Sequence, residues 1–207
     1  STIVPVQTDY VHDPQLALSV NAYLSKEIAT TIQTKLIEPL KAVDPTHYYY
    51  PVEALHVTIH SVRIIHDPPM YTPKDIETSR RLLEKRIPLE QPFPFMFHGV
   101  MSLPTSVACI ALITPDYDRF ARSLRRTFID AGIPDDKTYF TDEMVFANTT
   151  FCRYTHKPSS ELLEKLETLK EVHIGEFLAK EVSLVEINAG AHPSKTRLFG
   201  TYRFAQN

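Results

Sequence analysis

The chain has 207 residues, of which 43% are apolar, and this length and composition predict one folded unit with a sizeable core. Its 22 basic and 25 acidic residues give a formal charge of −3, which argues against a protein that coats duplex DNA, because neutralising many phosphates needs a basic face. The longest apolar run, VACIALI at 107–113, is too short to span a membrane.

The chain contains two cysteines, Cys109 and Cys152. Because a structural zinc site would need more ligands of this kind, we expect neither to bind metal. We expect both to be reduced core residues of a cytoplasmic protein that carries no secretion signal.

The first elements alternate between a strand pattern and a helix pattern. The loosely alternating segment at 15–24 predicts a strand. Behind it, Ser25 can cap a helix, and apolar residues recur every four positions over 26–43. This spacing marks one buried face of a helix, which Pro39 weakens near its end.

The rest of the chain continues the mixture of strands and helices. In order, the patterns predict extended structure at 47–65 with a break near Pro51, a helix at 73–87, strands at 93–103 and 106–114, a helix at 115–131, a strand at 143–155, a helix at 159–172, and a closing strand pair at 177–190 and 196–205. Because strands occur in hairpins as well as between helices, the order favours an α+β fold over a doubly wound parallel sheet.

Polar side chains occupy every second position of ALHVTIHSV at 54–62, namely His56, Thr58 and His60. On a strand all three share one face, and His56 and His60 lie about 13 Å apart along it. Two ligands of one zinc ion must each lie about 2 Å from the metal, so we expect no metal site here.

His56 and Thr58 can instead act together on a phosphate. An imidazole transfers protons near neutral pH, and a hydroxyl beside it donates a hydrogen bond to an anionic oxygen. The same residues also fit an ordinary half-buried strand in which they have no chemical role.

A second motif of this kind occurs in VFANTTFCRY, where Asn148 and Thr150 are again two residues apart in an extended run. Each motif is followed by a helix-rich stretch, which suggests two similar halves that face each other. We therefore expect His56, Thr58, Asn148 and Thr150 to line one groove.

Together the motifs resemble those of the two-histidine (2H) phosphoesterases, which include the RNA 2′,3′-cyclic phosphodiesterases once called 2′-5′ RNA ligases. PVEALHVTIHSV is similar to the first motif of that family, including the glutamate shortly before the histidine. VFANTTFCR is similar to the second motif, with Thr150 and Arg153 at the matching places. The order of the flanking elements also fits, so the resemblance spans residues 15 to 204.

The resemblance implies a single domain over residues 1–207, with two pseudo-symmetric lobes whose antiparallel sheets line a central groove and whose helices lie outside. Three positions depart from the family pattern. Asn148 stands where the second histidine is expected, Ala147 replaces a proline, and Ser61 replaces a phenylalanine. In the family one histidine acts as general base and the other as general acid.

The implied function is binding and weak hydrolysis of a 2′,3′-cyclic phosphate, or of a related phosphodiester at a nucleotide or RNA end, without metal or cofactor. His56 would transfer the proton, while Thr58 and Thr150 hold the non-bridging oxygens. Asn148 can hydrogen-bond a phosphate oxygen but cannot transfer a proton, and losing one such group lowers the rate by a factor of about 10² to 10⁴.

Two other functions stay open at this point. The first is a non-catalytic nucleotide-binding or interaction module that has lost its second histidine. The second is a structural α+β protein in which the motifs arise by chance. The expected partner is a nucleotide or a short RNA end with a cyclic phosphate, not duplex DNA or a membrane, and the expected state is a monomer.

Further residues near the motifs can contribute. Tyr50 and Tyr154 could stack on a base. Arg153 and Asn148 are separated by an odd number of positions, so on a regular strand their side chains point to opposite faces of the sheet. We expect Arg153 to brace the lobe from that face or to reach around to the ligand. His60 shares a face with His56 and is a candidate replacement for the missing histidine, although its distance along the strand places it at the edge of the site.

Overall fold

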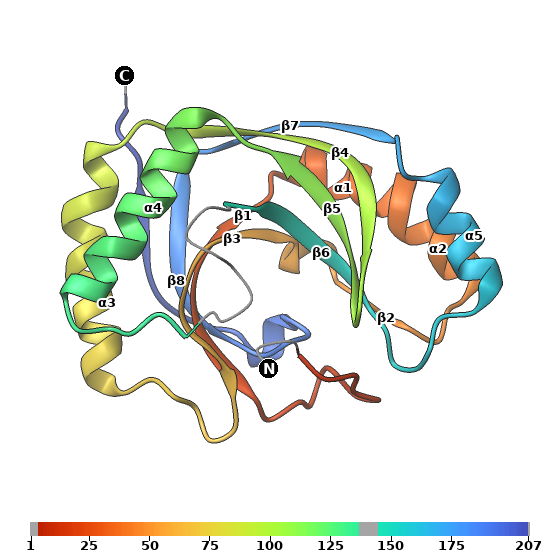
Figure 1. Cartoon of the computed structure of the whole chain (residues 1–207), viewed down its shortest axis with the longest axis horizontal. Helices are drawn as coiled ribbons and strands as arrows, with labels where there is room; N and C mark the ends of the chain where they lie inside the picture. Colours follow the sequence, from red (N-terminus) through yellow and green to blue (C-terminus); the bar gives the residue numbers. More distant parts are fainter. Residues whose placement is uncertain (1–3, 137–144, 207) are drawn as a thin grey trace.

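The computed structural model describes residues 4–136 and 145–206, and within them the chain folds into two antiparallel sheets with helices outside (Figure 1). The first sheet has four strands, in the order β3 (His56–His66), β1 (Leu16–Tyr23), β8 (Glu181–Ile187) and β9 (Arg197–Arg203). The second has five, in the order β2 (Tyr48–Tyr49), β6 (Ala147–Arg153), β5 (Ser106–Leu112), β4 (Phe93–Leu103) and β7 (His173–Ala179). The predicted two-lobed α+β fold is therefore confirmed.

The helices cover the outer faces of the sheets, as Figure 1 shows. They are α1 (Lys26–Ile32), α2 (Glu38–Val43), α3 (Pro73–Arg86), α4 (Pro115–Asp130) and α5 (Ser160–Thr168). α3 packs on β9 and α4 on β3, so this pair covers the first sheet. α1 packs on β7 and α5 on β4, so these helices cover the second, with α2 against α5.

This packing crosses between the lobes. α4 lies in the chain between β5 and β6 of the second sheet, yet it covers the first sheet. α1 follows β1 of the first sheet, yet it covers the second. Each sheet therefore buries its outer face with a helix that follows a strand of the other sheet, and the buried apolar side chains of both lobes form one continuous cluster.

Side chains cap the helices at the predicted starts. Thr72 accepts a hydrogen bond from the N–H of Asp75, whose carboxylate accepts one from the N–H of Thr72, and this reciprocal pair begins α3. Thr114 accepts from the N–H of Tyr117 at the start of α4. These caps satisfy N–H groups that have no partner within the helix.

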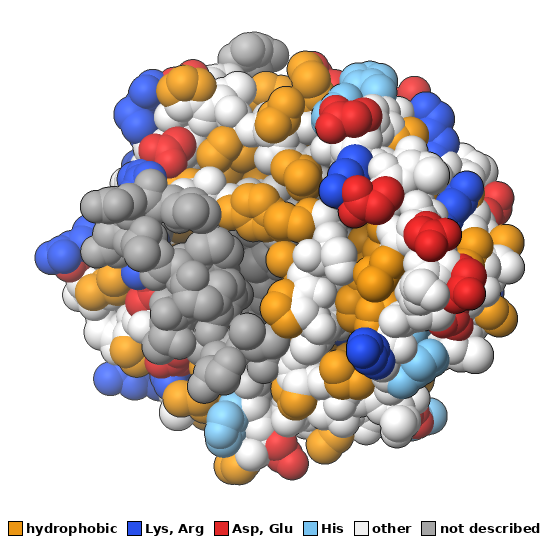
Figure 2. Space-filling view, turned by 45° about the vertical axis from the view of Figure 1, so that its right-hand side comes forward, with side chains coloured by type: hydrophobic (Ala, Val, Ile, Leu, Met, Phe, Trp, Pro, Cys, Tyr) orange, Lys and Arg blue, Asp and Glu red, His pale blue; other side chains and the backbone are white. Residues whose placement is uncertain are grey.

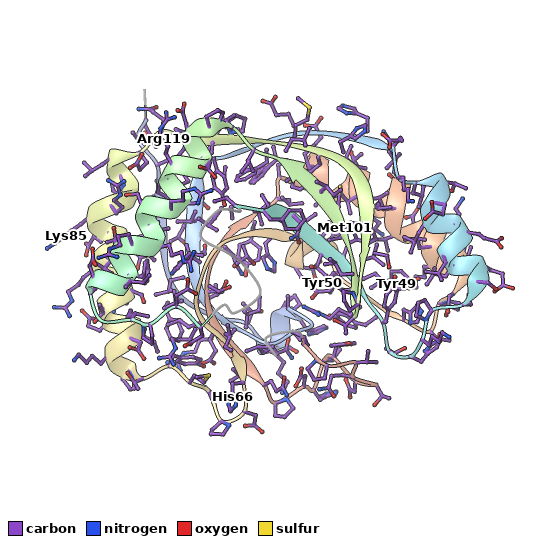
Figure 3. All side chains as sticks on the ribbon, in the orientation of Figure 1. Tyr49, Tyr50, His66, Lys85, Met101 and Arg119 are labelled. Carbon is purple, nitrogen blue, oxygen red and sulfur yellow. The ribbon has the colours of Figure 1, made fainter. Side chains whose placement is uncertain are left out.

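The outer faces of α3 and α4 are charged. Lys85 of α3 and Arg119 of α4 point away from the sheets (Figure 3). Acidic and basic side chains are interspersed over the right-hand part of the face in Figure 2, and the described part of that face carries no continuous basic surface. Within the described ranges, no helix combines the length and the apolar character that crossing a membrane requires.

The segment predicted as one helix over 26–43 contains a wider turn. A π-helical stretch, Gln33–Ile37, separates α1 from α2. Pro39 explains its place, because proline has no N–H to donate and its ring clashes with the carbonyl four residues earlier. That carbonyl belongs to Lys35, inside the wider turn, where the regular bonding pattern is already relaxed.

Other predicted strands differ at their ends. The stretch at 47–65 divides into β2, a 3₁₀ turn at Val52–Ala54, and β3. The expected single strand at 177–190 instead falls on the end of β7 and on β8, which lie in different sheets with Lys180 between them. The strand expected at 143–155 begins at Ala147, and its first two positions lie outside the described residues.

Replacing Phe128 tests the packing of α4 on the first sheet. Phe128 is 1% exposed and its ring centroid lies 4.5 Å from that of His60 on β3. We expect Phe128→Ala to lower the free energy of unfolding by about 3–5 kcal/mol, measured by urea denaturation. Its neighbour Ile129 is 39% exposed, and Ile129→Ala should cost less than about 1 kcal/mol. Equal losses in the two variants would show that this face of α4 is not the buried one.

Candidate functional site

A pocket of about 160 Å³ lies where the two sheets meet, and both motif strands contribute to its wall. His56 and Thr58 of β3 line it together with Asn148 and Thr150 of β6. The structure thus brings the two motifs, which are far apart in the sequence, to one place. All four side chains are half-buried, so they can meet a ligand from solvent.

The ring of His56 is held by its own backbone. Its Nδ1–H donates to the carbonyl oxygen of Ala54 at 2.7 Å, which leaves the lone pair on Nε2. Burial lowers the pKa of His56, opposed by the hydrogen bond to Ala54, while the positive charge of Arg153 lowers it further. His56 is therefore neutral near pH 7 and suited to accept a proton.

The register of β3 changes directly after Thr58. Thr58 pairs with Asn21 of β1, whereas His60 pairs with the adjacent Val20, so Ile59 is an extra residue. One extra residue turns the side chains that follow it to the opposite face. His60 therefore packs against Phe128 of α4, and the expectation that it shares a face with His56 is wrong.

β6 also contains one extra residue, and it turns Arg153 toward the pocket rather than away from it. Thr150 pairs with Ala108 of β5, whereas Cys152 pairs with Val107, so Phe151 is the extra residue. Arg153 consequently turns to the face of Thr150 and lines the pocket. The expectation that Arg153 points to the other face of the sheet is wrong for this reason.

Arg153 is fixed by contacts from both lobes. Its Nε–H lies 2.8 Å from the hydroxyl oxygen of Tyr50 and 2.6 Å from the carbonyl oxygen of Ala189, and both accept from it. The Tyr50 hydroxyl also donates to Ala189, and the guanidinium carbon lies 5.8 Å from the ring centroid of Tyr10. Among the described residues, the pocket lining contains no aspartate or glutamate, so the charge of Arg153 is available to an anion.

The two tyrosines predicted to stack on a base have other surroundings. Tyr50, labelled in Figure 3, follows β2 and lines the pocket. It is 5% exposed, and its hydroxyl oxygen accepts the hydrogen bond from Arg153. Tyr154 lies outside the pocket, is 2% exposed, and shares a hydrogen bond of 2.8 Å with Ser102. Both are packing residues here, and only Tyr50 also borders the site.

The segment after β8 completes the pocket and was not predicted from the sequence. Asn188, Ala189 and Ala191 line it. The Asn188 amide donates to the carbonyl oxygen of Tyr10 at 3.0 Å, while its side-chain oxygen is buried without a hydrogen-bond partner in the described structure. A Cβ atom on Gly190 would lie 2.5 Å from that Tyr10 carbonyl oxygen, so the close approach requires glycine.

A titration checks the protonation state of His56. We expect its imidazole, followed by NMR, to titrate below its usual value of 6.5. Arg153→Gln should raise this pKa, because the change removes a positive charge that opposes protonation. Arg203→Gln, on exposed β9, is the control and should leave the titration unchanged. A value at or above 6.5 in the unmodified protein would contradict the assignment of His56 as a base.

Comparisons with known proteins agree with this architecture. No protein-family model and no curated protein sequence matches the chain. Among solved structures, TT0787 of Thermus thermophilus is similar with a TM-score of 0.65 and 16% identity, over 93% of this chain and 100% of that one. A phosphoesterase is similar with a TM-score of 0.63 and 15% identity, over 94% and 100%. E. coli LigT in complex with 3′-AMP is similar with a TM-score of 0.61 and 14% identity, over 93% and 99%. The chain therefore has the fold of these proteins, in agreement with the family resemblance of its two motifs.

Proposed function

We propose that the chain is a 2H phosphoesterase that binds a nucleotide phosphodiester in this pocket and hydrolyses a 2′,3′-cyclic phosphate slowly. The observation that carries the proposal is the composition of the pocket wall. It combines one neutral imidazole, two threonine hydroxyls from opposite lobes, and one arginine, with no carboxylate among the described residues. A phosphate diester is an anion with two non-bridging oxygens, and this set of groups complements it.

Each group has a separate role in binding. Arg153 supplies the charge-assisted interaction with a phosphate oxygen. Thr58 and Thr150 donate hydrogen bonds from the two sides, and these become stronger as negative charge builds up on the oxygens in the transition state. E. coli LigT structures that hold phosphate and ATP support a phosphate ligand in this fold.

The size of the pocket restricts what it encloses. At about 160 Å³ it is smaller than the pockets of about 300–1,000 Å³ that surround drug-sized ligands. It therefore encloses a phosphate with its adjoining sugar, while the base lies at the mouth. The end of a nucleotide chain would bind in this way. The pocket wall would then not contact the base and would not select one base over another.

The proposed reaction uses His56 as the base. Its Nε2 takes a proton from water as the water oxygen attacks phosphorus, and the bond from phosphorus to the 2′ or 3′ ribose oxygen breaks. The leaving oxygen must then gain a proton, which it takes from solvent water, while His56 returns the proton it accepted to solvent. Asn148 can donate a hydrogen bond to that oxygen but has no proton to transfer, which makes departure of the leaving group the slow event.

The second candidate is a module that binds the nucleotide without turning it over. Asn148 is the observation that favours it, because the general acid of the family is missing while the binding groups are all present in the pocket. The partner in either case is a nucleotide or short RNA end. The monomeric state and the cytoplasmic location stay predictions.

Two substitutions separate the candidates. His56→Ala should abolish hydrolysis of a 2′,3′-cyclic nucleotide, and Asn148→His should raise it by a factor on the order of 10² or more, because it restores the second proton-transfer group. Turnover is measured by chromatography of the monophosphate at equal concentrations of folded protein. If Asn148→His folds and binds the nucleotide but shows no gain, the non-catalytic module replaces the enzyme.

The pH dependence of the same assay reports which groups act. With His56 as the only proton-transfer group, the rate should rise with pH through the lowered pKa of His56 and then level off near neutrality. Asn148→His adds a group that must be protonated, so its profile should become bell-shaped. A bell-shaped profile in the unmodified protein would show that another side chain already serves as the acid.

Binding of 3′-AMP, the product when the bond to the 2′ oxygen breaks, tests Arg153 without any turnover. Arg153→Gln should weaken binding of 3′-AMP by a factor of about 10 to 100, as expected for the loss of a hydrogen bond to a charged group. Arg203→Gln removes an equal charge from an exposed position that pairs with Glu181, and it should leave the affinity unchanged. Calorimetry gives the dissociation constants of both variants. Equal losses of affinity would show that Arg153 acts through the overall charge of the protein rather than through contact with the phosphate in the pocket.

A further inference from the structure

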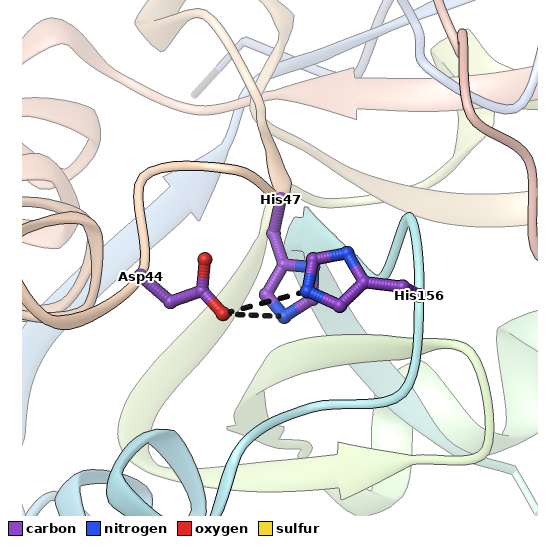
Figure 4. A group of neighbouring side chains, drawn as sticks. All are labelled: Asp44, His47 and His156. Carbon is purple, nitrogen blue, oxygen red and sulfur yellow. Dashed lines mark ion pairs between the residues drawn. The ribbon is translucent and has the colours of Figure 1, made fainter.

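Two histidines and an aspartate meet outside the pocket, at the end of the β2–β6 ladder (Figure 4). Asp44 and His47 lie on the loop between α2 and β2, and His156 lies on the loop between β6 and α5. Because Tyr48 pairs with Arg153 across the ladder, the two histidines that continue these strands come to lie side by side. Their ring centroids are 4.4 Å apart.

The donor atoms of this cluster have the spacing of metal ligands. His47 Nε2 lies 3.4 Å and His156 Nε2 lies 3.7 Å from the same oxygen, Asp44 Oδ2, and all three donor atoms lie within 4.8 Å of one another. Ligands about 2.0–2.1 Å from a tetrahedral zinc ion are about 3.3–3.4 Å from each other. Small side-chain rotations would therefore bring the three atoms to one ion.

His47 is the observation that points to a ligand. It is 4% exposed, and its Nε2 is buried without a hydrogen-bond partner in the described structure, although it faces the Asp44 carboxylate. A buried polar nitrogen that lacks a partner is unfavourable, and such groups in native structures commonly bind an ion or water. An ion between His47 and Asp44 would satisfy it.

Outer hydrogen bonds orient all three side chains. Asp44 Oδ1 accepts from the N–H of Thr46 at 3.1 Å and from the Thr46 hydroxyl, which leaves Oδ2 to face the imidazoles. The Thr155 hydroxyl oxygen lies 2.9 Å from His156 Nδ1 and 3.4 Å from His47 Nδ1. The N–H of Thr155 donates to His47 Nδ1 at 3.3 Å, which leaves the His47 proton on Nε2. Binding of an ion at Nε2 would move that proton to Nδ1, which can then donate to the Thr155 hydroxyl oxygen at 3.4 Å. The Thr155 hydroxyl donates to the carbonyl oxygen of Thr46, so its oxygen accepts from His156 Nδ1–H, and this holds His156 in the tautomer that leaves the lone pair of Nε2 for a metal.

We propose that Asp44, His47 and His156 bind one divalent transition-metal ion, of which Zn²⁺ matches the donor set best. Two imidazoles and one carboxylate suit zinc, whereas Ca²⁺ and Mg²⁺ prefer oxygen ligands alone. The His156 side chain is 51% exposed, so the ion can enter from solvent and keep a water as its fourth ligand. The bound ion joins the two loops at the open end of the β2–β6 ladder.

A Zn²⁺ titration of the full chain tests this site. After treatment with a chelator and removal of the chelator, calorimetry should show about one equivalent of Zn²⁺ bound with a Kd of about 1 μM or less. His156→Ala should weaken binding at least about tenfold, and because His156 is exposed the variant should fold. Asp44→Asn keeps the shape of the side chain, removes its charge, and should also weaken binding.

The matched control is His98→Ala. His98 is a strand histidine with a carboxylate neighbour, Glu171, at 3.1 Å, and its side chain is 39% exposed, but it lies outside the cluster. This variant should bind Zn²⁺ as the unmodified protein does. At a free Zn²⁺ concentration about 100 times the Kd of the unmodified protein, Tm should rise by roughly 5–10 °C in that protein and in His98→Ala, and by no more than about half as much in His156→Ala. Binding weaker than about 100 μM, or equal binding by His156→Ala, would overturn the proposal.

Discussion

The pocket depends on the placement of one arginine. Arg153 is held by Tyr50, by the Ala189 carbonyl and by the ring of Tyr10, yet no carboxylate among the described residues lines the pocket beside it. Neutral acceptors compensate only part of the unfavourable desolvation of a guanidinium. An incoming anion, as in the proposed function, would supply the rest. The same contacts join the second sheet, through Tyr50 and Arg153, to the segment that follows β8 of the first. The group that we propose to recognise the ligand therefore also joins the two lobes.

The sequence predicted which motif side chains line the pocket only as far as strand alternation stays regular. His56 with Thr58, and Asn148 with Thr150, share a face because no residue is inserted between the members of either pair. The alternation rule failed just beyond each motif, where Ile59 and Phe151 are the extra residues. Both are buried apolar side chains, and an apolar residue is the same signal whether it belongs to the regular pattern or interrupts it. The helix starts were predictable because the caps at Thr72 and Thr114 are local signals. The fold class was predictable because it follows from the order of strands and helices along the chain.

Features that depend on long-range pairing could not be predicted in this way. Nothing local shows that Tyr154 turns toward Ser102 and the core, or that the chain changes sheets at Lys180. The cluster of Asp44, His47 and His156 is of the same kind, because its members meet only when β2 pairs with β6. His56 and His60 lie four residues apart on one strand, where geometry excludes a shared metal ion, whereas the three donor atoms of the cluster converge from two loops.

The position of β8 has a consequence for synthesis of the chain. β8 lies between β1 and β9, so one side of β1 stays unpaired until residues 181–187 have been made. On a ribosome, this edge of the first strand would keep its N–H and C=O groups open through most of translation. Such an edge invites pairing with other nascent chains, and contacts this distant in sequence form slowly. The helices can form early, but the sheet that carries His56 is assembled only after β8 has emerged.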